Sequence, residues 1–271
     1  MKLSDIKLDN RSYDRIKSIV YSISGISLGS TKKDMVSSRL NKRLLEIGIG
    51  NFKDYCTFLK ENDQECQTLI NLISTNVTSF FRENDHFDYI CDQIEAAYER
   101  GQRRFRIWSA ACSTGQEPYS LAISLKERFQ KNSSTLNDLK ILATDISTTA
   151  LEQANKGEYN SRASESIPDF TRFKYFNSLA SGHYQINNEI KNLITFTQLN
   201  LTHIPYPMHG PLDVILCRNV MIYFDNQTKN RIINQFQKLM SKGSSLIVGH
   251  SESLGNLNSP FKLVKPSIYK Y

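Results

Sequence analysis

The stretch Arg106–Ala122 constrains the fold of this chain more than any other. Bulky residues at and just before its start, Phe105, Ile107 and Trp108, favour a β-strand. From Ser109 to Gly115 no side chain is larger than threonine, which lets a ligand approach the backbone closely. Pro118 suits the start of a helix, and apolar residues then follow with helical spacing at Leu121, Ala122, Leu125 and Phe129. In α/β sheets, a turn at the carboxyl end of a strand is where nucleotide-like ligands bind.

This turn does not match the phosphate-binding patterns. It lacks the three glycines of the dinucleotide fingerprint and the Gly-Lys-Ser/Thr end of a P-loop. Glu117 also stands where a diphosphate would lie, and a negative side chain there favours a ligand with a cationic part. S-adenosylmethionine fits, because it carries a sulfonium, an amino group and ribose hydroxyls but no phosphate. The alternative is that the small residues form only a tight connection.

A second acidic residue, Asp145, ends the predicted strand Leu139–Thr144. An acid at the tip of the second strand is well placed to accept hydrogen bonds from two ribose hydroxyls. The alternative is that Asp145 caps the next helix, because Asp-Ile-Ser-Thr-Thr-Ala-Leu is typical of a helix start. The two roles are compatible.

At 271 residues, 39% of them hydrophobic, the chain can form two domains or one large one with a proper core. No apolar run approaches the roughly 20 residues of a membrane span, and Met1–Asp5 lacks a signal-peptide core. We therefore expect no membrane insertion. The five cysteines are scattered without metal-ligand spacing, so we expect reduced thiols, a cytoplasmic location and no metal.

Part of the net charge of +7 is concentrated near the N-terminus, where eight basic and two acidic residues lie between Arg11 and Arg43. Such a balance favours an acidic partner: nucleic acid, anionic lipid or an acidic protein surface. The alternative is that the lysines serve only solubility.

Residues 1–75 are predicted to be wholly helical. In one helix, capped by Ser30 or Thr31 and ended by Gly48 and Gly50, one face is apolar. The inward positions are Val36, Leu40, Leu44 and Ile47, and the opposite side carries a basic stripe of Lys32, Arg39, Lys42 and Arg43. The alternative for the stripe is a solvated face. Further helices are expected at Asn51–Leu59 and Glu65–Thr75.

Beyond residue 75, strands and helices alternate, which predicts an α/β fold with a doubly wound, largely parallel, Rossmann-like sheet. Helices are expected at Phe87–Arg100, from beyond Asp145 through Asn155, and at Asn226–Lys242, where Gly243 ends the helix. Strands are expected at Leu193–Leu199, Leu212–Cys217 and Ser245–Gly249. The irregular residues 157–188 are expected to form a small insertion with a hairpin around Ser181-Gly182. Phe261–Tyr271 is expected to form a terminal hairpin.

The strand Leu212–Cys217 ends abruptly in Arg218 and Asn219. Polar residues at the carboxyl end of a strand are placed to line a crevice, and Tyr223 is close enough in sequence to reach the same crevice.

Six segments, in order along the chain, carry a family resemblance: Thr75–Glu83, Trp108–Tyr119, Ala143–Ser147, Asn200-Leu201, Cys217–Phe224 and Gly249–Leu254. With them the chain resembles chemotaxis receptor protein-glutamate O-methyltransferases of the CheR type. The resemblance implies a receptor-docking helical domain over residues 1–75. It also implies a methyltransferase domain over 76–271, with an antiparallel β insertion at about 157–192.

The resemblance further implies S-adenosylmethionine as methyl donor and S-adenosylhomocysteine as product, without a metal. The acceptors would be glutamates in the cytoplasmic helices of membrane chemoreceptors, esterified in sensory adaptation. Independently of the resemblance, we expect the chain to be a monomer. Cofactor contacts would come from Asn76, Thr78, Arg82, Glu117, Asp145, Asn200, Leu201, Arg218 and Asn219. Arg82 and Tyr223 would lie nearest the transferred methyl group. Some family members dock their insertion on a receptor tail.

This chemistry needs no general base, because a glutamate with a pKa of about 4.3 is already ionised at neutral pH. Positioning and desolvation then suffice. Arg82 would bind the carboxylate of either the cofactor or the substrate, and Tyr223 would orient the acceptor. A structural role for His250 is favoured over a role as base, and Cys112 and Cys217 are expected to be packing residues.

The basic stripe of Lys32, Arg39, Lys42 and Arg43 would dock on the glutamate-rich receptor helices. Two other functions compete with this one. A nucleic-acid methyltransferase would usually carry Asn/Asp-Pro-Pro-Tyr/Phe after the fourth strand, where this chain has Arg218–Met221. A non-catalytic receptor-binding module is disfavoured by the intact Glu117, Asp145, Arg82 and Tyr223. We therefore expect no nucleic-acid partner.

Overall fold

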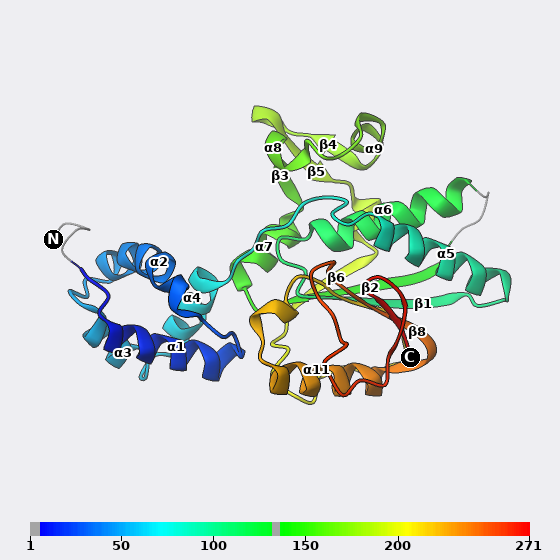
Figure 1. Cartoon of the computed structure of the whole chain (residues 1–271). Coiled ribbons are helices and arrows are strands. Elements are labelled where there is room, and N and C mark those ends of the chain that lie inside the picture. The colour runs from blue at the N-terminus through cyan, green and yellow to red at the C-terminus, as the bar shows by residue number, and fades with distance from the viewer. Residues whose placement is uncertain (1–5, 132–135) are drawn as a thin grey trace.

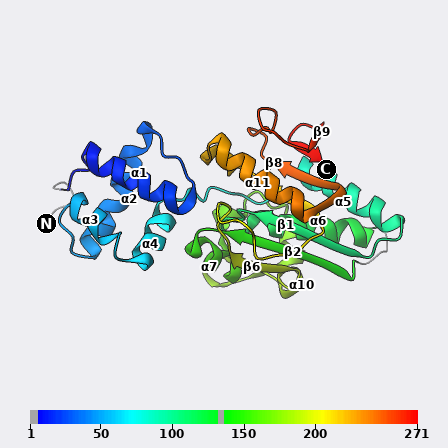
Figure 2. The same ribbon diagram turned by 90° about the horizontal axis from the view of Figure 1, so that it is seen from below.

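The computed structural model describes residues 6–131 and 136–271 of the chain. A helical domain lies at one end of the molecule and a sheet domain at the other (Figures 1 and 2). Among the described residues, no helix is both long and apolar enough to cross a membrane. The helical domain comprises α1 (Asn10–Ser24), η2 (Ser30–Lys32), α2 (Lys33–Glu46), α3 (Phe52–Phe58) and α4 (Asp63–Ile73).

The inward face predicted for α2 is confirmed, since Val36, Leu40 and Leu44 are buried in the core of the helical domain. The predicted cap is wrong. A single 3₁₀ turn precedes α2, and the helix begins at Lys33 without a side-chain hydrogen bond from its N-cap residue.

The basic stripe is not one continuous surface, because two of its arginines turn toward α4. Arg39 Nη1 donates to the carbonyls at the end of α4, including those of Ile73 and Ser74 at 3.0 and 2.9 Å. Arg43 Nη2 lies 2.6 Å from Glu65 Oε2, and Glu65 also accepts a hydrogen bond from the Tyr55 hydroxyl. The two arginines thus join helices within the domain.

The central sheet has seven strands in the order β6-β2-β1-β7-β8-β10-β9. They are β1 (Arg104–Ala110), β2 (Asp138–Asp145), β6 (Ile194–Gln198), β7 (Leu212–Cys217), β8 (Met240–Val248), β9 (Lys262–Lys265) and β10 (Ile268–Lys270). The strands from β6 to β8 pair in parallel, whereas β10 and β9 are antiparallel. The predicted doubly wound sheet and terminal hairpin are confirmed.

Helices cover both faces of this sheet, with α5 and α6 on one side and α11 on the other (Figure 1). The main helices are α5 (Asp85–Glu99), α6 (Gln116–Lys131), α7 (Thr148–Lys156) and α11 (Asn226–Leu239). Because side chains alternate along a strand, Ile107 packs in the core under α5 and α6. Its neighbour Trp108 packs in the opposite core, 5.3 Å between ring centroids from Phe236 of α11.

The predicted end of the helix Asn226–Lys242 at Gly243 is wrong. The helix α11 ends at Leu239, because Met240 is already extended and pairs with Leu212 of β7. Gly243 therefore lies within β8, with a φ of 92°.

A small antiparallel sheet, ordered β3-β5-β4, stands above α6 and α7 (Figure 1). This insertion contains β3 (Glu158–Asn160), α8 (Ser161–Ser164), α9 (Asp169–Tyr175), β4 (Phe176–Ser178), η3 (Ala180–Gly182), β5 (His183–Ile186) and α10 (Asn188–Lys191). The hairpin predicted around Ser181-Gly182 is confirmed, since β4 and β5 pair across it. Phe80 packs edge-on against Tyr159 and Phe176 and so anchors the insertion.

We predict that Glu65→Ala lowers the free energy of unfolding by about 3 kcal/mol, because it leaves Arg43 and the buried Tyr55 hydroxyl without their shared acceptor. Urea unfolding measures the change. The control is Glu46→Ala, which removes a more exposed partner of Arg43 at 3.5 Å and should cost at most about 0.5 kcal/mol. Equal effects of the two variants would contradict the structural role of Glu65.

Candidate active site

The turn after β1 is tight because several of its residues adopt positive φ. Ala111 and Ser113 have φ of 72° and 52°, and Gly115 has 94°. A Cβ atom on Gly115 would lie 2.9 Å from the Cβ of Ala154 in α7 and 3.0 Å from the Tyr159 hydroxyl. The glycine therefore lets the turn sit directly against α7 and the insertion.

Asp145 joins the turns that follow β1 and β2. Its Oδ2 accepts a hydrogen bond from the Ser113 amide at 2.7 Å, and its Oδ1 accepts one from the Ser147 amide at 2.9 Å. Burial raises the pKa of Asp145, and these backbone hydrogen bonds oppose the rise. The residue that caps α7 is Ser147, whose hydroxyl accepts from Ala150, so the alternative of Asp145 as the cap is wrong.

Glu117, on the first turn of α6, faces a buried arginine. Its Oε2 lies 3.2 Å from Nη1 of Arg218, and its Oε1 accepts a hydrogen bond from the Ser109 hydroxyl at 2.7 Å. The Arg218 side chain is only 1% exposed and pairs on its other side with Glu83 at 3.2 Å. Burial raises the pKa of Glu117, and the charge of Arg218 opposes that rise.

Two acids that the sequence interpretation left without a role shape the end of β7. Glu252 accepts hydrogen bonds from the amides of Asn219 at 2.7 Å and Gly249 at 2.6 Å, and so fixes Asn219 with a φ of 56°. Glu83 accepts from the Asn219 side chain at 3.3 Å and from Arg218. Burial raises the pKa of Glu83, but the charge of Arg218 and these hydrogen bonds hold it below its usual value. Glu83 and Glu252 both lie in sequence segments that carry the family resemblance, and this position is the signal by which they could have been found.

These elements border one cleft between the two domains, with about 1220 Å³ of empty space, part of it open to solvent. The structure brings together there every predicted cofactor and catalytic residue, along with one residue of the basic stripe: Asn76, Thr78, Arg82, Glu117, Asp145, Asn200, Leu201, Arg218, Asn219, Tyr223 and Lys32. The remaining stripe residues, Arg39, Lys42 and Arg43, do not line the cleft.

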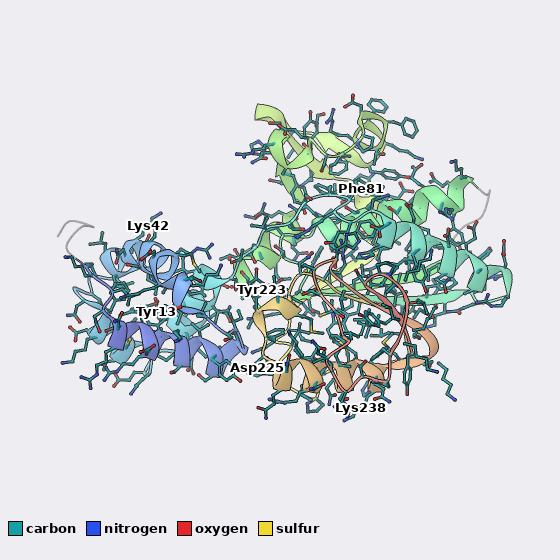
Figure 3. All side chains as sticks on the ribbon, in the orientation of Figure 1. Tyr13, Lys42, Phe81, Tyr223, Asp225 and Lys238 are labelled. Carbon is teal, nitrogen blue, oxygen red and sulfur yellow. The ribbon has the colours of Figure 1, made fainter. Side chains whose placement is uncertain are left out.

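The helical domain forms one wall of the cleft, which the sequence did not predict. The Ser27 amide donates to the Tyr223 carbonyl at 2.8 Å, and the Asn200 side chain donates to the Ile23 carbonyl at 2.6 Å. The Tyr21 hydroxyl donates to Asp225 at 2.5 Å. In Figure 3, Tyr223 and Asp225 lie on the side of the sheet domain that faces the helical domain, whereas Lys42 projects from the outer side of α2.

Other candidate residues have contrasting environments. Arg82 is 37% exposed and donates to the Val77 carbonyl at 3.1 Å. His250 is exposed, with its Nε2 3.2 Å from Asp85 Oδ2. Cys112 and Cys217 are buried, and burial raises the pKa of both thiols well above the usual value, which suits packing residues.

Comparison with known proteins agrees with this site. Residues 76–270 match the family described as "CheR methyltransferase, SAM binding domain", and residues 11–74 match "CheR methyltransferase, all-alpha domain". The chain belongs to the CheR methyltransferase family. It is similar to the chemotaxis protein methyltransferase of Borreliella burgdorferi, with 38% identity over 98% of this chain and 96% of the relative. The Escherichia coli protein of the same name is 35% identical over 97% of this chain and 92% of its own length.

This chain is therefore an S-adenosylmethionine-dependent methyltransferase of chemotaxis. The residues present fit this cofactor. Asp145 and Glu117 give the cleft an acidic character at the ends of β2 and β1, and Arg218 is already paired with two carboxylates. Such a surface suits hydroxyl groups and positive charge better than phosphate.

We predict that Gly249→Ala weakens S-adenosylmethionine binding about tenfold, or about 1.4 kcal/mol. A Cβ at Gly249 would lie 2.4 Å from the Asn219 side-chain nitrogen and 2.9 Å from Glu252 Oε2, so Asn219 must move. Isothermal titration calorimetry measures the affinity. The control is Gly255→Ala, where the new Cβ would meet Ser253 Oγ at 3.4 Å. Unchanged affinity in the Gly249 variant would exclude Asn219 from the cofactor contacts.

Proposed function

We propose that this methyltransferase esterifies glutamate side chains in the cytoplasmic helices of membrane chemoreceptors, as part of sensory adaptation. The observation that carries the proposal is the contrast between two arginines of the cleft. Arg218 is buried and saturated by Glu83 and Glu117. Arg82 is partly exposed; it donates to the Val77 carbonyl, and its Nε lies 3.8 Å from Glu83 Oε1, farther than either carboxylate lies from Arg218. Arg82 is thus available to a carboxylate that enters the cleft.

The residues around Arg82 suit an acceptor that arrives ionised. When bound, S-adenosylmethionine supplies an electrophilic methyl group. The acceptor carboxylate is ionised at neutral pH, so no side chain of the enzyme needs to remove a proton from it. Arg82 binds the carboxylate of either the acceptor or the cofactor, and the Tyr223 hydroxyl orients the acceptor. The cofactor itself lies among the nine residues proposed from the resemblance, from Asn76 to Asn219.

The receptor would approach over the helical domain. Lys32 and Lys42 are exposed, and Lys32 also lines the cleft. Arg39 and Arg43 contribute by fixing α2 against α4, since their guanidinium groups are engaged there. The docking surface proposed for the glutamate-rich helices therefore rests on the two lysines.

Labelled S-adenosylmethionine tests the function directly. The protein is incubated with chemoreceptor-containing membranes and, separately, with RNA. We expect a base-labile methyl label on receptor protein, which is characteristic of a glutamyl ester. A label on RNA would indicate a nucleic-acid methyltransferase, and the absence of label on either would indicate a non-catalytic receptor-binding module.

Tyr223→Phe should lower the receptor methylation rate about fivefold, because one hydrogen bond of about 1 kcal/mol to the acceptor is lost. The dissociation constant of S-adenosylmethionine should stay within about twofold. Initial rates and calorimetry separate the two effects. Tyr98→Phe on α5, outside the cleft lining, is the control. A Tyr223 variant with the normal rate would refute the orienting role.

The double variant Lys32→Glu/Lys42→Glu should slow methylation of intact receptor about fivefold at low salt, where surface charges act most strongly, and less at high salt. The matched control, Lys53→Glu/Lys60→Glu, reverses two exposed charges near α3. Because Lys32 lines the cleft, cofactor affinity is measured alongside. If both double variants keep the normal rate at low salt, α2 is not the docking surface.

A further inference from the structure

A cluster of imidazole and carboxylate groups lies behind the cleft, where the start of α5 meets the end of β8. His86 is fully buried, and within the described chain neither of its ring nitrogens has a hydrogen-bond partner. Its Nδ1 lies 3.4 Å from Glu83 Oε2, and its ring packs edge-on against that of His250 at 4.7 Å. His250 Nε2 is in turn 3.2 Å from Asp85 Oδ2.

Buried polar atoms without partners are rare in proteins and point to a bound water or ion. Here one donor atom each from Glu83, His86 and His250 lies within 4.8 Å of the others. Two imidazoles with carboxylates suit a divalent transition-metal ion, whereas Mg²⁺ and Ca²⁺ prefer oxygen ligands.

We propose that Glu83, His86 and His250, with Asp85 beside them, form a binding site for a divalent transition-metal ion of the zinc class. His250 and Asp85 are 48% and 62% exposed, which gives the ion a path from solvent and lets both side chains adjust to it. The sequence showed no such site because its ligands come from two distant segments, one around the start of α5 and one after β8.

Occupation of this site would act on the cofactor cleft through Glu83. The oxygen that faces His86, Oε2, is the same atom that lies 3.2 Å from Arg218 Nη2. A metal ion on that oxygen would be close to the guanidinium, so like charges repel and the arrangement of Arg218 and Asn219 is disturbed. The ion and S-adenosylmethionine should therefore weaken each other's binding by the same factor. This consequence rests on the proposed cofactor role of Arg218 and Asn219.

The test begins with metal binding in the absence of cofactor. The full chain is titrated with Zn²⁺ by calorimetry, and with Co²⁺ as a spectroscopic probe of nitrogen and oxygen ligands. We expect one ion per chain and an affinity at least tenfold lower in His250→Ala. His209→Ala, which removes another exposed histidine, is the control. Absence of binding, equal binding by both variants, or a thiolate–Co²⁺ absorption band would each overturn the site.

The second step measures S-adenosylmethionine affinity with and without saturating Zn²⁺. We expect a loss of at least fivefold in the wild-type protein and in His209→Ala, and no loss in His250→Ala. An unchanged affinity in zinc-loaded wild-type protein would overturn the coupling. Neither step uses a receptor, so the outcome is independent of the proposed acceptor.

Discussion

The candidate active site of this protein depends on one buried guanidinium. Arg218 is 1% exposed and lies between Glu83 and Glu117, at 3.2 Å from each. Its partners come from the segment before α5 and from α6, while Arg218 itself directly follows β7. Loss of one member of such a group leaves an uncompensated buried charge, at a cost of about 3–5 kcal/mol. The three motifs can therefore hold their places only together.

The helical domain closes the cleft that the edge of the sheet leaves open. A parallel sheet gathers the ends of β1, β2 and β7 along one edge, but that edge alone is an open crevice. The end of α1 and the following residues close it, through the contacts of Ser27 with Tyr223 and of Asn200 with Ile23. The domain proposed to meet the receptor is thus also a wall of the candidate cofactor cleft, so the proposed receptor and methyl donor would bind on neighbouring surfaces.

The sequence predicted those parts of the site that follow from strand topology. Asp145 ends a strand, Glu117 and Arg218 come after one, and the carboxyl ends of parallel strands lie along the same edge of the sheet. The sequence did not predict side-chain contacts between two different helices. The spacing of Arg39 and Arg43 shows which side of α2 they occupy but not that α4 packs there. It also gave no role to Glu252, because a carboxylate that accepts backbone amides from two separate turns has no signature in local sequence.

The two arginines of the cleft, Arg218 and Arg82, differ in how far their charges are already neutralised by neighbouring carboxylates. Arg218 has its charge neutralised by Glu83 and Glu117, so it contributes order and little attraction for an incoming anion. Arg82 directly precedes Glu83 in the sequence, but its side chain is partly exposed. Phe81 and Glu83, on either side of Arg82, both have a φ of 54°. That left-handed backbone is unfavourable for residues other than glycine, and it persists here because Glu83 is fixed by Arg218. The buried ion pair thereby fixes the backbone next to the partly exposed Arg82, the residue proposed to bind a carboxylate.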